Sequence, residues 1–371
     1  MSSRSFIFAG GGTGGHIYPA IAVAEQIVKL QPSARVRFFC SSRSIDTQIL
    51  AKTGFDYTML PAKGFSIMPG KLVGFCTSFL KSYKIARKSL SESKDAVVIG
   101  VGGFVAAPVC LAAHKLKFPI VLLNVDIVPG RANKIIARWA REVFVQFEDT
   151  TQYFANTKAK VSVVGCPLRS GFSNPQPQKV IEQLGLDKDK KVLLVTGASS
   201  GAENINTAIC SLLEKLDTFA DNWQIVHLAG VSNFEKVKSR YSSAKIGHKV
   251  LGYFDDMPDL LAAADLVVGR SGAVSVAEFA AAAVPSICIP YPYHKDKHQY
   301  LNARRLVDTG AAVIVDDLPD ATGRAERLWK EMEKLMKDEN KRQEMKQNCL
   351  KIARIDAALK IAERLGTVVR G

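Results

Sequence analysis

Residues 265–305 read DLVVGRSGAVSVAEFAAAAVPSICIPYPYHKDKHQYLNARR, and this stretch predicts how the surrounding chain folds. Its apolar start, residues 265–269, predicts a short buried strand that leads into an Arg-Ser-Gly turn. An Ala-rich helix follows the turn, and residues 286–291 predict a second strand. The order strand, turn, helix, strand indicates an α/β fold.

The start of that helix is suited to bind an anion. Backbone N–H groups at a helix start are unpaired and the helix dipole is positive there, so a phosphate group can bind. Glu278 lies about one turn into the helix, where a carboxylate suits the paired hydroxyls of a ribose. Together the two features indicate a site for a nucleotide diphosphate, with a plain helix cap beside an exposed Glu as the alternative. The polar run at residues 294–302 predicts a loop at the end of a strand, where sites commonly lie.

Length and composition limit the possible classes of protein. The 371 residues suffice for two domains with separate cores. Lys and Arg outnumber Asp and Glu by 50 to 35, which favours an anionic partner. Since no nucleic-acid-binding motif occurs, phosphorylated substrates and an acidic membrane surface are favoured over nucleic acid. The seven cysteines form no C-x-x-C pair, which predicts a reducing, cytoplasmic compartment.

Two further glycine-rich turns predict two domain starts. Residues 5–9 predict a strand that leads into the glycines of residues 10–15, and a helix is predicted over residues 19–29. A strand over residues 192–196 and the glycine loop at residues 197–202 repeat this arrangement. The chain is therefore predicted to contain two doubly wound domains.

His16 directly follows the first glycine loop. That loop contains G-x-G-x-x-G, but the strand predicted over residues 35–40 has no Asp or Glu at its end, which argues against a dinucleotide site. A glycine loop lets a bulky ligand approach the backbone, and the near-neutral pKa typical of histidine suits a general base. We therefore predict that His16 is catalytic, the alternative being a structural histidine.

Several segments resemble one enzyme family. R-S-G-A-V-S-V-A-E at residues 270–278 and H-K-D-K-H-Q-Y-L-N-A at residues 294–303 resemble the donor site of the MurG-type peptidoglycan transferases, which add N-acetylglucosamine to the lipid-linked muramyl-pentapeptide. Matching segments in matching order cover most of the chain, and they include G-G-T-G-G-H, G-V-G-G-F, P-G-R-A-N-K and G-C-P-L-R. The resemblance implies two doubly wound Rossmann-like domains that face a cleft, the GT-B glycosyltransferase architecture.

The resemblance also implies a separate role for each domain and an enzymatic activity. Residues 1–164 with 352–371 would form the acceptor- and membrane-facing domain, and residues 165–351 the UDP-sugar-binding domain. The implied enzyme is an inverting hexosyltransferase of peptidoglycan synthesis, and hence of cell-wall formation, cell shape and cell division. UDP-N-acetylglucosamine would be the donor, an undecaprenyl-linked muramyl-pentapeptide the acceptor and His16 the catalytic base, with no metal ion or other cofactor.

Specific contacts are implied in the same way. The backbone at Phe254 would contact uracil, Glu278 the ribose and Gln299 the sugar. The helix start at Ala273 and Arg169 would contact the diphosphate. The implied substrate-binding residues are Thr13, Gly14, Gly15, Asp126, Arg169, Ser199, Phe254, Arg270, Ala273, Val274, Ser275, Val276, Ala277, Glu278 and Gln299.

The chain departs from the family after the strand predicted over residues 120–123. The family carries His-Glu-Gln-Asn there, whereas this chain reads Leu123, Asn124, Val125, Asp126. Asp126 replaces a donor-contacting Asn, so an acceptor-only anion stands where the family has a neutral amide. Two alternatives stay open: a related UDP-sugar transferase with another lipid or small-molecule acceptor, and a non-catalytic nucleotide-binding protein.

Residues 65–88 interleave apolar and basic side chains, a pattern typical of surfaces that bind anionic membranes. An ordinary amphipathic helix packed on a sheet is the alternative. In the first case, the protein would be peripheral on the inner face of the cell membrane. We expect the docking face to include the nearby residues Arg131, Lys134, Arg138, Trp139 and Arg141.

Overall fold

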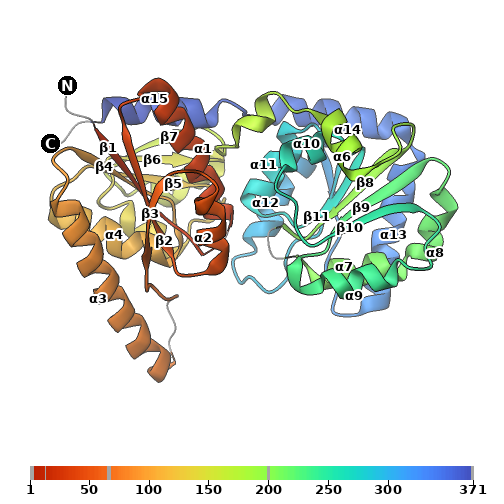
Figure 1. Cartoon of the computed structure of the whole chain (residues 1–371), viewed down its shortest axis with the longest axis horizontal. Coiled ribbons are helices and arrows are strands. Elements are labelled where there is room, and N and C mark those ends of the chain that lie inside the picture. The colour runs from red at the N-terminus through yellow and green to blue at the C-terminus, as the bar shows by residue number, and fades with distance from the viewer. Residues whose placement is uncertain (1–3, 13, 65–67, 199–200, 369–371) are drawn as a thin grey trace. The chain divides into compact units, whose positions relative to one another are not determined.

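The computed structural model describes residues 4–12, 14–64, 68–198 and 201–368. The chain forms two compact units: unit 1 is Met1–Arg169 with Ile355–Gly371, and unit 2 is Ser170–Arg354 (Figure 1). The first boundary falls after residue 169 rather than 164, and the chain returns to unit 1 at residue 355 rather than 352.

Unit 1 contains a seven-stranded parallel sheet in the order β3-β2-β1-β4-β5-β6-β7. Strands β4 and β5 are buried along their whole length, as expected for central strands of a parallel sheet that helices cover on both faces. The strands are β1 Ser5–Ala9, β2 Arg35–Ser41, β3 Asp56–Leu60, β4 Ala96–Gly100, β5 Ile120–Asn124, β6 Glu142–Val145 and β7 Lys160–Val163.

The C-terminal helix of the chain completes unit 1. It packs against α1, and its Ile361 and Leu365 are fully buried. Its Arg364 Nε donates a hydrogen bond to Glu142 Oε2 at 2.9 Å, which ties it to β6. The helices of unit 1 are α1 Gly14–Leu30, α2 Ser44–Ala51, α3 Pro69–Ser91, α4 Gly103–Lys115, α5 Arg131–Ile136 and α15 Ala357–Thr367.

Unit 2 contains a six-stranded parallel sheet in the order β10-β9-β8-β11-β12-β13. This is the strand order of a doubly wound nucleotide-binding domain. The strands are β8 Lys191–Thr196, β9 Trp223–Leu228, β10 Gly247–Leu251, β11 Leu266–Gly269, β12 Ser286–Cys288 and β13 Ala312–Ile314. The helices are α6 Pro177–Leu184, α7 Glu203–Ser211, α8 Leu213–Leu216, α9 Phe234–Arg240, α10 Met257–Ala262, α11 Ala273–Ala281, α12 His298–Val307, α13 Ala321–Lys337 and α14 Glu339–Ile352.

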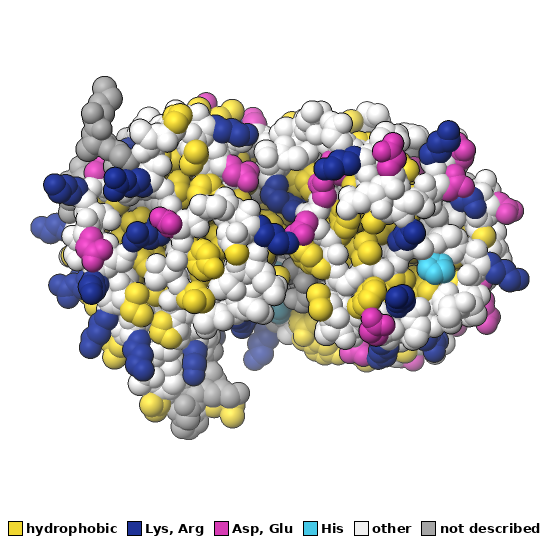
Figure 2. Space-filling model, viewed as in Figure 1, with side chains coloured by type: hydrophobic (Ala, Val, Ile, Leu, Met, Phe, Trp, Pro, Cys, Tyr) yellow, Lys and Arg dark blue, Asp and Glu magenta, His cyan; other side chains and the backbone are white. Residues whose placement is uncertain are grey.

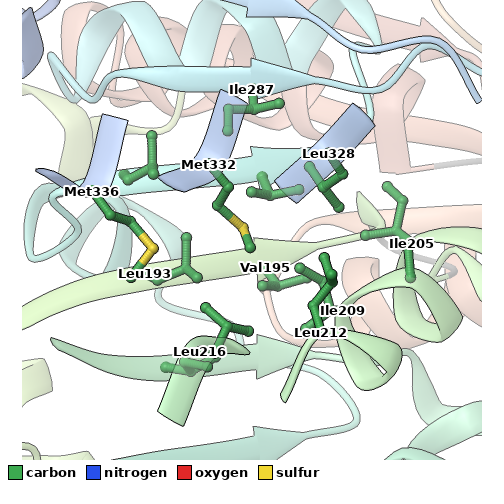
Figure 3. Close-up of a cluster of buried hydrophobic side chains, with 14 of the residues drawn as sticks. Leu193, Val195, Ile205, Ile209, Leu212, Leu216, Ile287, Leu328, Met332 and Met336 are labelled. Carbon is green, nitrogen blue, oxygen red and sulfur yellow. The ribbon is translucent and has the colours of Figure 1, made fainter. Parts of the chain in front are cut away.

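The core of unit 2 is built on β8. Leu193 and Val195 alternate with residues of the opposite face, so both point to the same side of the sheet, where α7 and α13 also pack (Figure 3). Their partners from the two helices include Ile205, Ile209, Leu328, Met332 and Met336. This packing fixes the start of α7.

Two predicted elements near the sites differ from the structure. The first helix begins at Gly14 rather than residue 19, so that the glycine loop runs directly into it and His16 is its third residue. The strand predicted over residues 286–291 ends at Cys288. Ile289 still donates to the carbonyl of Gly269 at 2.8 Å, but Pro290 has no N–H to continue the ladder. Arg270 Nη1 donates to the carbonyls of Ile289 and Pro290 at 3.0 and 3.3 Å.

The charged run at residues 330–360 is largely helical. It contains the end of α13, then α14, which Asp338 caps by accepting from the N–H of Lys341 at 2.8 Å, and the start of α15. The Ser-, Pro- and Gln-rich segment at residues 170–179 is ordered. It contains a 3₁₀ turn, Ser170–Ser173, with Phe172 buried, and the start of α6.

Candidate active site

In unit 1, the candidate residues gather where the strand order reverses. Strands β1 and β4 are neighbours, and each is followed by a glycine loop at its carboxyl end. Ligands of doubly wound sheets bind at such a reversal point. The two loops touch, because a Cβ added to Gly10 would lie 2.9 Å from Cβ of Val101.

The second glycine loop makes room for the imidazole of His16. Gly102 has a φ of +114°, and a Cβ there would lie 2.9 Å from Cδ2 and 3.0 Å from Nε2 of His16. The predicted match at residues 100–104 therefore has a physical reason: only glycine fits both the backbone angle and the space. His16 is half-buried in the first turn of α1.

The surroundings of His16 suit a base. Burial lowers the pKa of His16 below its ordinary value, and the negative charges of Asp126 and Asp46 oppose that shift. An imidazole with a lowered pKa is neutral near pH 7 and can accept a proton. The nearby carboxylates stabilise the imidazolium that forms when it does.

Asp46 of α2 accepts a hydrogen bond from the backbone of the first glycine loop. It is fully buried, and its Oδ2 accepts hydrogen bonds from the N–H of Gly12 at 2.7 Å, the N–H of Ser41 at 3.1 Å and the hydroxyl of Ser41 at 2.6 Å. Arg43 Nη1 donates to the carbonyl of Gly12 at 2.7 Å. Asp46 is not among the predicted site residues, because a dinucleotide fold has its acid at the end of the second strand, whereas this acid lies five residues after the end of β2.

The departure at Leu123 to Asp126 spans the end of β5 and the ordered turn that follows it. Asn124 Nδ2 donates to the backbone carbonyl of Asp126 at 2.7 Å, and Asn124 Oδ1 accepts from Asn133 Nδ2 at 2.8 Å. Both asparagines are buried, whereas Asp126 is half-buried. Because the charge of Asp126 acts on His16, the chain has a carboxylate beside its candidate base at the position where the family has an amide.

In unit 2, the reversal of strand order lies between β8 and β11. The glycine loop at residues 197–202 follows β8, and the Arg-Ser-Gly turn at residues 270–272 follows β11. The loop that contains Phe254 follows β10 and is half-buried at that residue. Parallel strands place all three segments at the carboxyl edge of one sheet.

Arg270 is an internal anchor of its turn. Its side chain is buried, and Nη2 lies 2.8 Å from Asp317 Oδ2. Asp317 also pairs with Arg324 at 2.7 Å and accepts from Asn204 Nδ2 at 2.9 Å. Since Nη1 already donates to two carbonyls, the guanidinium is occupied, and this favours a positioning role for Arg270 over direct contact with a substrate.

Residues of helix α12 form hydrogen bonds with the Arg-Ser-Gly turn at residues 270–272. The hydroxyl of Ser271, which is fully buried, donates to the carbonyl of Gln299 at 2.9 Å. Gln299 Oε1 in turn accepts from the N–H of Tyr291 at 2.9 Å, and Asn302 Nδ2 donates to the carbonyl of Ser271 at 3.4 Å. Gln299, which the family resemblance assigns to the sugar, thus uses its side-chain oxygen to hold the backbone at Tyr291.

Helix α11 presents its start and Glu278 as expected from the sequence. Gly272 is its N-cap, and the helix begins at Ala273. Glu278 is its sixth residue, about a turn and a half from the start, and is half-buried. Among the implied contacts, Ala273 and Val276 are buried, and three others are half-buried: Val274, Ser275 and Ala277.

A buried chain of hydrogen bonds, the relay, runs from Tyr241 through His227 to Asn206 behind the glycine loop of unit 2. A Cβ on Gly201, whose φ is +73°, would collide with the carbonyl of Ala229, so the loop rests on the end of β9. Asn206 Nδ2 donates to that carbonyl at 2.8 Å, and Asn206 Oδ1 lies 3.0 Å from His227 Nε2. As this oxygen only accepts, Nε2 carries the proton, and the hydroxyl of Tyr241 donates to His227 Nδ1 at 2.9 Å. Burial lowers the pKa of His227 to about 3, so the relay is uncharged.

Other predicted site residues fall elsewhere. Thr13 and Ser199 lie outside the described residues. Gly14 and Gly15 begin α1. Arg169 is the last residue of unit 1, and its guanidinium lies 4.5 Å from the ring centroid of Tyr18, so the structure groups it with α1. Within the described ranges, no three His, Cys, Asp or Glu side chains are grouped so as to hold a metal ion.

The sequence matches two family models. Residues 6–145 match the N-terminal domain of glycosyltransferase family 28, and residues 192–364 match its C-terminal domain. A relative from Thermoanaerobacter sp. (strain X514) is 34% identical over 371 residues, covering 98% of this chain and 99% of the relative. Its name is UDP-N-acetylglucosamine--N-acetylmuramyl-(pentapeptide) pyrophosphoryl-undecaprenol N-acetylglucosamine transferase.

Comparison with solved structures gives the same family. MurG of Acinetobacter baumannii superposes with a TM-score of 0.73 at 25% identity, covering 99% of this chain and all of that one. A UDP-GlcNAc 2-epimerase from Neisseria meningitidis bound to UDP-GlcNAc reaches a TM-score of 0.71 at 15% identity, covering 99% of this chain and all of that one, a likeness of fold alone. The fold class expected from the sequence, two doubly wound Rossmann-like domains of the glycosyltransferase kind, is confirmed. The chain belongs to glycosyltransferase family 28 and, within it, to the MurG-type transferases.

Proposed function

We propose that the protein transfers N-acetylglucosamine from UDP-N-acetylglucosamine to the undecaprenyl-linked muramyl-pentapeptide, with inversion at the anomeric carbon. One structural observation carries the proposal in unit 2: the turn before α11 is immobilised by Arg270 and Ser271, and it leaves a helix start for a diphosphate with Glu278 beyond it. The names of relatives that cover nearly the whole chain supply the identity of the two substrates.

The chemistry follows from the residues of each unit. His16 takes the proton of the acceptor hydroxyl, and the hydroxyl oxygen forms a bond to the anomeric carbon of the sugar. The bond from that carbon to the β-phosphate oxygen breaks, and UDP leaves with the electron pair. The N–H groups and the dipole at the start of α11 stabilise this developing negative charge, an arrangement typically worth about 3 kcal/mol per well-placed donor.

Transfer of radiolabelled sugar tests the proposal directly. We expect label from UDP-N-acetylglucosamine to appear in undecaprenyl-linked muramyl-pentapeptide, with release of UDP. A panel of other lipid-linked and small-molecule acceptors examines the alternative that the turn at residues 123–126 favours, a related transferase with another acceptor. Formation of an epimerised UDP-sugar without any transfer would contradict the proposal, and binding of UDP without turnover would indicate a non-catalytic protein.

Membrane attachment is the second part of the proposal, and helix α3 carries it. None of the helices in the described part of the chain is both long and apolar enough to cross a bilayer. The C-terminal part of α3 packs against α4 through Ser82, Ala86 and Leu90, all fully buried. Its other end projects from unit 1 (Figure 1), and there Leu72 and Val73 are 38% and 65% exposed. The alternative of a packed amphipathic helix therefore accounts for only part of α3.

Cations accompany these exposed apolar groups. Figure 2 shows Lys and Arg side chains along α3, where no residue is acidic. Helix α4 packs on both α3 and α5, which connects α3 to the exposed cations of α5 and the residues after it. We propose that this surface docks on anionic lipid, with the protein peripheral on the inner face of the cell membrane. The docking cations are Lys81, Lys84, Arg87, Lys88, Arg131, Lys134, Arg138 and Arg141.

Vesicle pelleting tests the docking surface. Binding to anionic vesicles should fall steeply as salt rises, because electrostatic attachment is screened. Val73→Ser should weaken binding, whereas Val231→Ser, at a site 76% exposed in unit 2, serves as the matched control. Equal binding to neutral vesicles, or none to either kind, would contradict this part of the proposal.

A further inference from the structure

The charge around His16 comes from several elements of unit 1. Asp46 belongs to α2 and Asp126 to the turn after β5, and both act on His16 through their negative charge. Two cations of unit 1 have partners of their own: Arg43 donates to the carbonyl of Gly12 and also lies 5.3 Å from the ring centroid of Phe104, and the guanidinium of Arg169 lies over Tyr18. The charges that act on the imidazole are those of the two carboxylates.

Asp46 differs from Asp126 in being entirely enclosed. The glycine loop wraps its carboxylate so closely that a Cβ on Gly11 would collide with Oδ2. Within the described residues, the hydrogen-bond partners of Asp46 are two backbone N–H groups and one hydroxyl, none of them a cation. Its charge is thus held in place by neutral donors and acts through low-dielectric surroundings on the adjacent loop.

We propose that Asp46 is a positioning residue for the transfer reaction. Its carboxylate fixes Gly12, and with it the loop that carries His16, and its charge favours the protonated imidazole that forms as the acceptor hydroxyl is deprotonated. The inference rests on the proposed role of His16 as base. It assigns to a buried acid of α2 a task that neither the glycine motif nor the site at α11 implies.

Titration of His16 by NMR tests the inference without reference to activity. In protein labelled at its histidines, the His16 resonance is identified by its absence from His16→Asn. Asp46→Asn should lower the pKa of His16 by about one unit, because an opposite charge is removed. Asp46→Glu keeps the charge and should restore the wild-type titration. Asp56→Asn is the matched control, since Asp56 is exposed at the start of β3, the end of that strand opposite the loops.

The pH profile of transfer provides the second readout. The base must be unprotonated to act, so a lower pKa of His16 moves the acid limb of kcat/KM for the acceptor to lower pH by the same amount. UDP affinity should stay unchanged. Absence of transfer in the wild type would reject the proposed function, whereas transfer with identical pH limbs in wild type and Asp46→Asn would reject only this inference. An unfolded Asp46→Asn, or an equal shift in Asp56→Asn, would assign Asp46 a merely structural role and overturn the inference.

Discussion

The two units place different charges behind the same local structure. Both begin with a strand, a glycine loop and a helix. Behind the loop of unit 1 lies the carboxylate of Asp46, bound to the N–H of Gly12. Behind the loop of unit 2 lies the uncharged relay that ends at Asn206, and the turn before α11 is backed by two buried arginines around the single carboxylate of Asp317.

The proposed function accounts for this difference. A buried carboxylate next to a diphosphate would oppose binding, because two like charges about 4 Å apart interact by roughly 4 kcal/mol at an effective dielectric constant near 20. The same carboxylate next to a histidine base stabilises the imidazolium. Glycine spacing alone does not distinguish a loop that binds phosphate from one that carries a base; the charge behind the loop does.

The largest expected effect comes from breaking the cationic cluster of unit 2. Asp317→Ala leaves the buried Arg270 and Arg324 without their shared carboxylate and should destabilise unit 2 by about 3 to 5 kcal/mol. Denaturation in a Trp139→Phe background isolates this unit, because the other two tryptophans of the chain, Trp223 and Trp329, both lie in it. Glu203→Ala, which breaks an exposed pair with Lys236, is the control and should leave the transition in place.

Removing the proposed base of unit 1 should lower turnover without changing the binding of UDP by unit 2. His16→Ala should lower turnover by about 10² or more, as expected for a lost general base, while UDP affinity stays near that of the wild type. Steady-state transfer and calorimetry with UDP measure the two quantities. Loss of UDP binding with turnover retained would show that His16 serves the donor, and the contrast between the loops would then be wrong.

Substitution of Glu278 tests the proposed binding of UDP by unit 2. Glu278→Ala should weaken UDP binding by about 1.5 to 3 kcal/mol, the range for a hydrogen bond to a charged group. Glu278→Gln keeps the shape and one acceptor, so an intermediate loss is expected. Calorimetric affinities for UDP that are the same in all three proteins would reject the ribose assignment.

The uncharged relay predicts how the stability of unit 2 depends on pH. The pKa of His227 is about 3 in the folded protein, against 6.5 for an ordinary histidine, so the unfolded state binds the extra proton between these values. Stability is therefore complete above about pH 6.5 and declines as pH falls toward 3, with a slope of up to about 1.4 kcal/mol per pH unit from this group. His227→Gln should remove that part of the slope, and an unchanged slope would contradict the assignment.

The smallest effect is expected from the departure at Asp126. Asp126→Asn restores the amide of the family and removes a negative charge, so UDP affinity should stay the same or rise slightly. Calorimetry with UDP and the transfer assay distinguish the possible roles. If transfer is lost while UDP still binds, the carboxylate acts on the base or the acceptor, in keeping with its effect on His16.

Several strands, the glycine turns and the family could be predicted from the sequence alone. Strands β1 and β11 begin within one residue of the predicted start, because apolar runs flanked by glycine turns are local signals. The backbone at Gly102 and Gly201 has positive φ, which a glycine in the sequence already suggests. The predictions for His16 and Glu278 rest on the same signals, since each residue lies within one turn or two of a glycine turn.

The side chains that lie behind the glycine loops could not be predicted from the sequence, because they come from distant segments of the chain. Asp46 meets Gly12 across 34 residues, and His227 meets Asn206 across 21. The motif places Arg270 among the substrate-binding residues, but folding brings Asp317 to it from the end of another strand. Such pairs depend on which strand ends converge at one edge of a sheet, and this convergence is set by strand order rather than by the periodicity of any single segment.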